Sequence, residues 1–394
     1  MAVANGSFSY QPPLLLQQME SDLATLPMFL GDSEDIIITD HKPSTKFLDT
    51  LNINGFEIPS FHSLSEAESF PDNSMDIIYP WGWSPSAHFI LKNLKGKCGQ
   101  KFNVQPNSQW IETHRKLYER STALQFLQEL LENNRTNKFV EQKQTGQVVH
   151  SISDIENLLI ANYPLVLKAP MSSSGRGVQI IRKLLLNASN KQWLAGILKQ
   201  QNYLIAEPFI DKISDLSFQF RINSEQDIDF LGISIFETNS NGQYQGTILN
   251  PVFSSLFPGR EHELKELCDL TSQQLLYALK NSIYAKLHRG FLGIDAMIFE
   301  KNGSLKIQPC VEVNCRMNMG ILALQIQNKI HPEVSGKFEL IYDKNGILPV
   351  YKQKNKEKQN PGFHEGKFCE GFLPLTEANE QSKFGAYISL GTAK

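Results

Sequence analysis

Apolar and polar residues alternate over residues 311–318, Val-Glu-Val-Asn-Cys-Arg-Met-Asn. This period of two predicts a half-buried β-strand. Successive side chains on a strand point to opposite faces. Glu312, Asn314 and Arg316 therefore share one face of the predicted strand, while Val313 and Cys315 share the other.

A second predicted strand, Gly293–Phe299, carries one acidic residue, Asp295, in an apolar run. If the two strands pair as a hairpin, Asp295 faces the same side as Glu312. A carboxylate, an amide oxygen and a guanidinium in one row suit a divalent ion that carries polyphosphate. Oxygen ligands match Mg²⁺, and the fork of an Arg matches a phosphoryl group. Two ordinary strands with a solvated polar face would show the same pattern.

Helical periodicity of leucines predicts helices over Trp110–Asn134 and Leu264–His288. Shorter helices are predicted over 151–161 and 319–330, and further strands over 165–168, 178–181, 203–210, 216–223, 229–237, 368–373 and 384–390. The polar, basic stretch Lys352–Lys358 is interpreted as a linker or loop.

The N-terminal segment predicts a small α/β domain. Asp35–Asp40 and Asp76–Pro80 are short apolar runs typical of buried parallel strands, and helical pieces lie between them. Trp81 and Trp83 follow the second run. They either line a substrate cleft or pack this domain against its neighbour. No Gly-x-Gly-x-x-Gly follows either run, so a dinucleotide-binding domain is not supported.

Lys168 ends an apolar run and precedes a loop of small residues, which are Ser172, Ser173, Ser174, Gly175, Arg176 and Gly177. A Lys in a buried run is costly unless it meets an anion. The hydroxyls and backbone N–H groups of the loop would form a donor nest for phosphate oxygens. This is not a Walker A loop, because the Lys precedes the glycines and a strand follows. The alternative is a plain hairpin loop with Lys168 in solvent.

The composition is that of an ordinary globular protein of two or three domains, with 394 residues, a net charge of -3 and 20% charged residues. This balance gives no electrostatic argument for a nucleic-acid or membrane partner. No apolar run approaches the ~18 residues of a membrane span, and the first ten residues lack the features of a secretory signal. The five cysteines have no Cys-x-x-Cys spacing, so they are expected to be reduced and not metal ligands. The expectation is a soluble cytoplasmic protein.

With these pieces in order, the chain resembles the ATP-grasp superfamily over about Trp110–Ile330. The resemblance depends on four stretches in the family's order, which are 165–178, 206–209, 290–295 and 312–316. It implies an α/β and α+β fold, with a pre-ATP-grasp α/β domain at 1–109 and an ATP-grasp domain of two α+β subdomains at 110–345. The lid subdomain would span about 135–205, and residues 346–394 would be a C-terminal linker and capping segment.

The resemblance also implies the site residues. Lys168 would contact the phosphates of ATP, and the loop Ser172–Gly177 would close over them. Glu207 would lie at the adenine and ribose, on a segment that includes Phe209. The other implied roles are Asp295, Glu312 and Asn314 as ligands of Mg²⁺ (two ions are expected), Arg316 near the transferred phosphoryl group, Asn318 as a weaker candidate, and Lys116 as an earlier phosphate-binding Lys with Arg115 as its alternative.

The implied activity is an ATP-dependent ligase that activates a carboxylate as an acyl phosphate for attack by an amine or thiol. The acid would be a small molecule or a peptide. The alternatives are a phosphotransferase on the same scaffold and a nucleotide-binding regulator without turnover. The sequence leaves the substrates and the oligomeric state open. Arg221, Arg260 and His262 are weak candidates for a carboxylate contact, since surface or structural roles are commoner.

Overall fold

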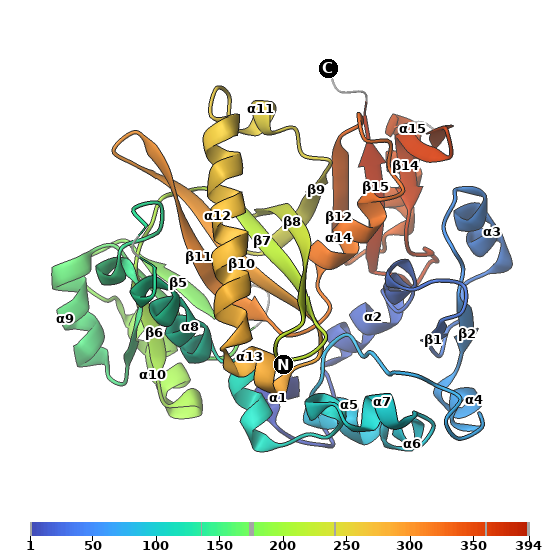
Figure 1. Ribbon diagram of the computed structural model, residues 1–394, viewed down its shortest axis with the longest axis horizontal. Coiled ribbons are helices and arrows are strands. Elements are labelled where there is room, and N and C mark those ends of the chain that lie inside the picture. Colours follow the sequence, from blue (N-terminus) through green and yellow to red (C-terminus); the bar gives the residue numbers. More distant parts are fainter. Residues whose placement is uncertain (1, 135, 173–176, 240–241, 359–360, 392–394) are drawn as a thin grey trace.

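The computed structural model describes residues 2–134, 136–172, 177–239, 242–358 and 361–391. Within these residues the strands form three sheets, of nine, four and two strands. The large sheet occupies the centre of the molecule, with the small four-stranded unit on one side and the N-terminal segment on the other (Figure 1).

Neighbouring strands of the large sheet pair antiparallel throughout. In their order across the sheet they are β11 (Ser304–Asn314), β10 (Gly290–Lys301), β7 (Lys212–Ile222), β8 (Ile228–Thr238), β9 (Tyr244–Leu249), β12 (Gly336–Tyr342), β15 (Phe384–Leu390), β14 (Lys367–Pro374) and β13 (Gly362–His364). The expected boundary at residue 345 falls between β12 and β15 in the sequence, yet these two strands pair directly. The predicted division into units stays a prediction.

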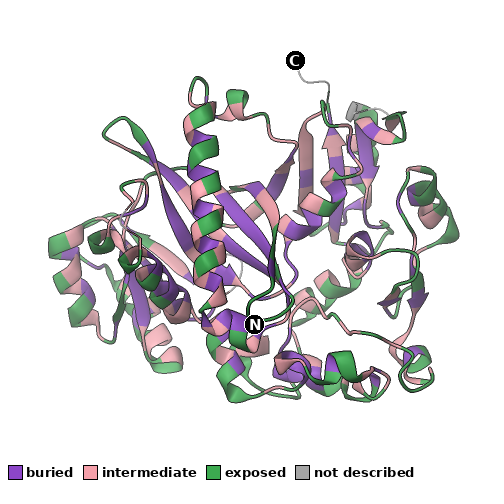
Figure 2. Cartoon of the chain, in the orientation of Figure 1, coloured by how far each residue is buried: buried purple, intermediate pink, exposed green. Residues whose placement is uncertain are grey.

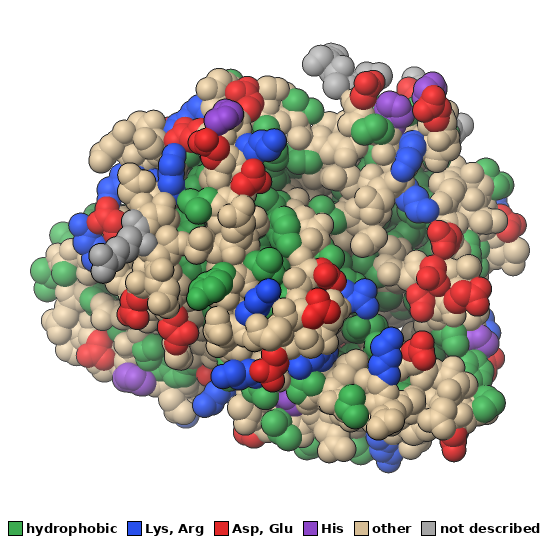
Figure 3. Space-filling view, viewed as in Figure 1, with side chains coloured by type: hydrophobic (Ala, Val, Ile, Leu, Met, Phe, Trp, Pro, Cys, Tyr) green, Lys and Arg blue, Asp and Glu red, His purple; other side chains and the backbone are tan. Residues whose placement is uncertain are grey.

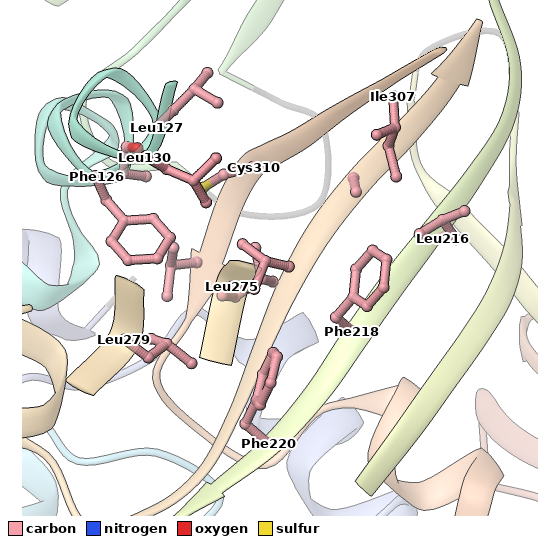
Figure 4. Packing of buried hydrophobic residues seen from close by; sticks show 14 of the residues in the cluster. Phe126, Leu127, Leu130, Leu216, Phe218, Phe220, Leu275, Leu279, Ile307 and Cys310 are labelled. Atoms are coloured by element: carbon pink, nitrogen blue, oxygen red, sulfur yellow. The ribbon is translucent and has the colours of Figure 1, made fainter. Parts of the chain in front are cut away.

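Helices α8 (Arg120–Glu132) and α12 (Glu261–Lys280) cover one face of this sheet. Figure 4 shows their side chains packed with those of β7 and β11; the labelled residues are Phe126, Leu127, Leu130, Leu275, Leu279, Leu216, Phe218, Phe220, Ile307 and Cys310. The leucine periodicity therefore produces a buried helix face, and each such side chain stabilises the fold by about 1.5–3 kcal/mol. Figure 2 shows that burial is concentrated along these strands.

The helix predicted over Leu264–His288 is two helices, so that prediction is wrong in its length. α12 ends at Lys280, and α13 (Ile283–Leu287) begins after Ser282. The Ser282 side chain accepts the backbone N–H of Ala285. Because a Ser at this position caps a new helix start, it divides the apolar stripe that periodicity alone makes continuous.

The second face of the large sheet is covered by α14 (Met319–Gln327). Leu322 and Ile326 of this helix pack with Leu249 of β9 and Phe338 of β12. Strands β9 and β12 were not predicted. The segment predicted as a polar linker at 352–358 belongs to a helix, α15 (Leu348–Lys358). That prediction is wrong because Tyr351, at the first turn of this helix, holds it in a cluster with Ile347, Phe372 and Tyr387.

The four-stranded sheet has the order β3 (Gln147–Val149), β6 (Leu204–Pro208), β4 (Leu165–Lys168) and β5 (Val178–Ile181). Helices α9 (Ile152–Asn162) and α10 (Ala188–Gln201) pack on it. Its core includes Leu159, Leu167, Leu194 and Leu204. β4 and β5 pair antiparallel, so the small-residue loop connects a hairpin, as predicted.

The N-terminal segment contains a two-stranded parallel sheet, β1 (Ile36–Ile38) with β2 (Ser60–His62). Its helices are α1 (Ala2–Asn5), α2 (Leu14–Asp22), η1 (Leu26–Leu30), α3 (Thr45–Ile53), α4 (Leu64–Glu68), α5 (Pro85–Ile90), α6 (Lys92–Lys95), α7 (Gln100–Asn103), η2 (Pro106–Ser108) and η3 (Glu112–Tyr118). The remaining short helices of the described chain are η4 (Gln142–Gln144) and α11 (Phe253–Leu256).

The strand predicted at Asp76–Pro80 is not a strand, and that prediction is wrong. Ile77 and Ile78 pack against a small cluster that contains Trp83 and Phe102, and no ladder forms along them. A short apolar run satisfies a packing cluster as well as a sheet, and its sequence does not distinguish the two.

Positive and negative side chains are interspersed over the face shown in Figure 3. In the described part of the chain, no helix is long and apolar enough to cross a membrane.

Candidate functional site

Asp295 of β10 and Glu312 of β11 are direct cross-strand partners. Side chains of paired residues on antiparallel strands lie on the same face of a sheet, so the hairpin expected from the sequence is present. Asn314 donates from Nδ2 to Oδ2 of Asp295 at 3.0 Å. Burial, together with the nearby Glu312 carboxylate, raises the pKa of Asp295 to about 7.

Arg316 extends this group beyond the end of β11. Its Nη2 donates to Oδ1 of Asn314 at 2.8 Å, and its Nη1 donates to the backbone oxygen of Met317. Asp295, Asn314 and Arg316 thus form one hydrogen-bonded row. Asn318 lies apart from the row: it caps α14 and donates to Gln219 at 3.0 Å.

Lys168 and Glu207 come from neighbouring strands of the small sheet, β4 and β6. The Lys168 Nζ lies 2.6 Å from Oε2 of Glu207, and their side chains are only 9% and 12% exposed. The Lys168 side chain is therefore buried and paired with a carboxylate. This excludes the alternative of a plain hairpin loop with Lys168 in solvent.

Arg120, the first residue of α8, joins the two sheets. Its Nη2 donates to both carboxylate oxygens of Glu312, and its Nη1 donates to the backbone oxygen of Ala169 and to Oγ of Ser172. The Arg120 side chain is 8% exposed. One buried guanidinium thus contacts the acidic strand of the large sheet and the start of the loop that follows Lys168.

The sequence predicts Lys116, with Arg115 as its alternative, as the earlier phosphate-binding residue, and Arg120 is not among these candidates. Lys116 is exposed on η3, whereas Arg120 is buried. One feature of the sequence distinguishes Arg120: it lies three residues after Leu117 and four before Leu124, both buried. This spacing places Arg120 on the apolar side of the helical segment.

The buried thiol of Cys310 on β11 lies within electrostatic range of charged groups from both sheets. Burial raises the pKa of Cys310, and Asp295, Lys168, Glu207 and Glu312 all act on this thiol electrostatically. These four residues come from four different strands. Residues that are far apart in the sequence therefore converge on one region between the sheets.

The loop between β4 and β5 is described only at its ends, and Ser173, Ser174, Gly175 and Arg176 lie outside the described residues. The ends are close together, because the backbone N–H of Ala169 donates to the oxygen of Gly177 at 2.7 Å. A Cβ at Gly177 would come within 2.4 Å of Ser172 Oγ, so this position requires glycine.

Phe209 follows β6 and is held by both backbone and ring. Its N–H donates to the oxygen of Pro164 at 2.9 Å. The Arg182 guanidinium lies 4.5 Å from the centre of its ring. Phe209 lines an open cleft at the end of the small sheet, together with Pro208 and Tyr163.

The weak candidates for a carboxylate contact lie elsewhere. Arg260 pairs with Glu263 and Glu300, and His262 is exposed at the start of α12. Arg221 is exposed on β7.

Trp83 is buried, and the backbone oxygen of Trp81 accepts the N–H of Met317 at 2.9 Å. The Trp81–Trp83 segment thus packs the N-terminal segment onto the residues that follow β11.

Neither protein-family models nor curated proteins match the sequence. Solved structures match it over most of its length. A biotin carboxylase–β-γ-ATP complex from Campylobacter jejuni is 13% identical with a TM-score of 0.55, over 95% of this chain and 86% of that one. N5-carboxyaminoimidazole synthetase from Staphylococcus aureus is 15% identical with a TM-score of 0.50, over 95% and 91%.

A third structure is the biotin carboxylase domain dimer of 2-oxoglutarate carboxylase from Hydrogenobacter thermophilus, in complex with MgADP, ADP and bicarbonate. It is 13% identical with a TM-score of 0.52, over 86% of this chain and 77% of that one. The first two proteins are of the ATP-grasp type. This chain has the ATP-grasp fold, which confirms the resemblance at the level of the fold.

Proposed function

We propose that this protein is an ATP-dependent ligase that activates a carboxylate as an acyl phosphate for attack by an amine or thiol. The observation that carries the proposal is the convergence of two sets of groups. Asp295, Glu312, Asn314 and Arg316 come from the large sheet, and Lys168 and Glu207 come from the small sheet. Arg120 contacts both sheets.

The two buried cations of the site fit a polyphosphate. In the structure Lys168 is neutralised by Glu207, and Arg120 by Glu312. Burying a charge is costly unless it is paired. Phosphate oxygens would be alternative partners for both cations, because guanidinium and ammonium groups form strong charge-assisted hydrogen bonds to phosphate. Ser172, the loop after it and Gly177 would contribute hydroxyl and backbone N–H donors.

The side-chain oxygens of Asp295, Glu312 and Asn314 fit Mg²⁺ as ligands, because this ion prefers oxygen ligands and keeps several waters. The pKa of Asp295, raised to about 7, indicates a carboxyl that gains from a nearby cation. Binding of Mg²⁺ at Glu312 would require Arg120 to leave that carboxylate and turn to a phosphate. The groups that we propose to hold Mg²⁺ and the nucleotide are therefore paired with one another in the structure.

Mg-ATP, when bound, would supply a transferable phosphoryl group. A free carboxylate is a poor acyl donor because its oxygen is a poor leaving group, and phosphorylation converts that oxygen into a good one. Lys168, Arg120 and Arg316 would neutralise charge that develops on the moving group. The loop after Lys168 would exclude water from the acyl phosphate. Glu207 and Phe209 are proposed to lie toward the base and ribose.

The substrates are proposed from chemistry and from the neighbours. One solved structure of this fold is a complex with MgADP, ADP and bicarbonate, and these ligands support a nucleotide and a small oxyanion as substrates here. We propose that this chain takes a carboxylate acid as the phosphoryl acceptor and an amine or thiol as the second substrate.

The test uses purified protein with ATP, MgCl₂ and a panel of acids and amines. ADP and inorganic phosphate should appear only when an acid and an amine are both present. With an ¹⁸O-labelled acid, ³¹P NMR should show one ¹⁸O in the released phosphate, since an acyl phosphate keeps the bridging oxygen of the acid. A phosphorylated product without free phosphate would contradict the ligase proposal and indicate a phosphotransferase.

A further inference from the structure

The face of the large sheet that carries Asp295 and Glu312 continues inward as a group of buried polar residues. Ser217 of β7 is the cross-strand partner of Asp295, and Ser234 of β8 is the partner of Ser217. Gln219 lies two residues beyond Ser217 on the same strand and therefore faces the same side. The exposed fractions are 0% for Gln219, 2% for Ser234 and 4% for Ser217. Polar side chains buried to this degree are costly unless they are hydrogen-bonded.

The amide of Gln219 is hydrogen-bonded at both of its ends. Its Oε1 accepts from Nδ2 of Asn318 at 3.0 Å, and its Nε2 donates to Oγ of Ser234 at 3.2 Å. The backbone sets the orientation of the Asn318 amide, because its Oδ1 accepts the N–H groups of Gly320 and Ile321 at 2.9 and 3.1 Å. The Nδ2 of Asn318 is then the end that donates, and this determines which end of the Gln219 amide it meets.

A glycine on β10 makes the contact between the two amides possible. Gly293 is the cross-strand partner of both Gln219 and Asn314. A Cβ at Gly293 would lie 2.6 Å from Nδ2 of Asn318 and 2.8 Å from Oε1 of Gln219. The hydrogen bond between the amides therefore occupies the space that a side chain on β10 would fill. It joins the sheet directly to the N-cap residue of α14.

Arg316 lies in the turn that this hydrogen bond holds. The turn runs from Asn314, at the end of β11, to Asn318, immediately before α14. At the start of the turn Asn314 donates to Asp295. At its end Asn318 donates to Gln219. Arg316 is midway between these two anchors, so the direction of its side chain depends on both of them.

We propose that Gln219 is a positioning residue, which fixes through Asn318 the turn that directs Arg316 toward the phosphoryl group. The inference rests on the proposed function for the role of Arg316 at that group. Gln219 is fully buried, so it acts on the reaction only through Asn318 and the turn. Without Gln219 the buried amide of Asn318 loses its acceptor, and the turn shifts because an unsatisfied buried donor is costly.

The test replaces Gln219 by Met, which has a similar length and no amide to meet Asn318. In the ligase assay, Gln219→Met should lower kcat for ADP formation about ten- to a hundredfold, since a displacement of about 1 Å in a catalytic geometry can cost a hundredfold. The affinity for an ATP analogue should change less than about twofold, because Arg316 is proposed to act on the group in transfer and not on the bound nucleotide. An unchanged kcat would overturn the proposal.

Ser234→Ala is the matched control. Ser234 is buried to a similar degree and bonds to the opposite end of the Gln219 amide, so its loss leaves the bond to Asn318 in place. The kcat of Ser234→Ala should stay close to that of the wild type. A loss of kcat equal to that of Gln219→Met would show a general effect of the buried polar group and would overturn the proposal.

Asn318→Ser serves if Gln219→Met does not fold. Serine is also a favoured N-cap residue, so α14 keeps its cap while the bond to Gln219 is lost. This variant should lose kcat to a similar extent as Gln219→Met, and an unchanged kcat would overturn the proposal.

Amide hydrogen exchange without ATP tests the same bond independently of turnover. The N–H groups of Gly320 and Ile321 bond to Asn318. They should exchange about three- to tenfold faster in Gln219→Met, the factor expected for the loss of one hydrogen bond, and unchanged exchange would overturn the proposal. Faster exchange in a protein that ligates no acid would contradict the proposed function and leave the anchoring of the turn intact. Ligation by the wild type with an unchanged kcat in Gln219→Met would contradict this inference alone.

Discussion

Arg120 and Glu312 form an ion pair in which one guanidinium nitrogen, Nη2, donates to both carboxylate oxygens, at 3.3 and 3.2 Å. The pair connects the first residue of α8 with the acidic strand β11. The same guanidinium holds Ser172 at the start of the phosphate-loop candidate. A bound Mg-nucleotide would compete for both members of this pair.

The first prediction concerns Arg120. Arg120→Gln should weaken ATP binding about ten- to a hundredfold, because a hydrogen bond to a charged group contributes about 1.5–3 kcal/mol. Arg120→Lys should fall between the wild type and this variant, since it keeps the charge without the fork. Isothermal titration with an ATP analogue measures the affinities. Lys116→Gln is the control; a loss as large as that of Arg120→Gln would return the phosphate contact to Lys116.

The second prediction concerns turnover. Glu312→Gln and Lys168→Ala should each lower kcat for ADP formation by about a hundredfold or more, as removal of one preorganised electrostatic group commonly does. Circular dichroism should show a retained fold. Glu300→Gln, on the neighbouring strand and exposed, should leave kcat unchanged. Wild-type turnover in both site variants would refute the site assignment.

The third prediction concerns the Lys168–Glu207 pair in the protein without nucleotide. Lys168→Met or Glu207→Leu alone should lower the free energy of unfolding by about 3 kcal/mol, because each leaves a buried charge without its partner. The double variant should lose much less than the sum. Urea denaturation measures the three values. The exposed pair Lys337–Glu237 should show a coupling of about 0–1 kcal/mol, and equal couplings for the two pairs would contradict the burial argument.

The fourth prediction concerns Asp295 and pH. Its pKa in the folded protein is about 7, above the unfolded value of about 3.9. Between these values the folded state binds more protons than the unfolded state, so the free energy of unfolding should fall as pH rises from about 4 to 7. The slope should approach about 1.4 kcal/mol per pH unit, and Asp295→Asn should remove this contribution.

The affinity for Mg²⁺ should depend on pH in the opposite direction to the free energy of unfolding. Mg²⁺ needs the ionised carboxylate, so its binding should strengthen as pH rises to about 7 and should release protons below that pH. Titration calorimetry in two buffers of different ionisation enthalpy measures this release. Proton release that persists in Asp295→Asn would assign it to another group, and the exposed Asp269→Asn serves as the control.

The fifth prediction compares two glycines with positive φ. Gly290 has φ +107° and faces Tyr79, whereas Gly303 has φ +75° and open space where a Cβ would lie. Gly303→Ala should cost about 1 kcal/mol from its backbone conformation, and Gly290→Ala about 1–3 kcal/mol with a further loss from contact with Tyr79. Thermal unfolding of both variants tests this order. Equal stabilities would show that the N-terminal segment moves freely away from β10.

Local periodicity was sufficient to predict most of the strands and helices around the site. The alternation over 311–318 predicted which residues of β11 face Asp295, and Val313 and Cys315 are buried as expected. The Lys168 strand and its hairpin were also predicted correctly. These features are local, because a strand's two faces and a hairpin's connection are encoded within a few residues.

Other features depended on distant residues. The run Asp76–Pro80 was predicted as a strand, but its isoleucines pack beside Trp83 and Phe102. Strands β9 and β12 were missed, although they join the centre of the large sheet. Whether a short apolar stretch becomes a strand depends on a partner elsewhere in the chain, so its own pattern is insufficient.

By itself, the sequence determined the row of Glu312, Asn314 and Arg316, the lysine before a small-residue loop, and the leucine faces of the helices that cover the sheet. Only the tertiary structure decided that Arg120, not Lys116, contacts both sheets, that Lys168 pairs with Glu207, and that Gln219 bonds to Asn318. The physical reason is that charge pairing and burial depend on distances between side chains, and packing brings together residues that the sequence keeps far apart.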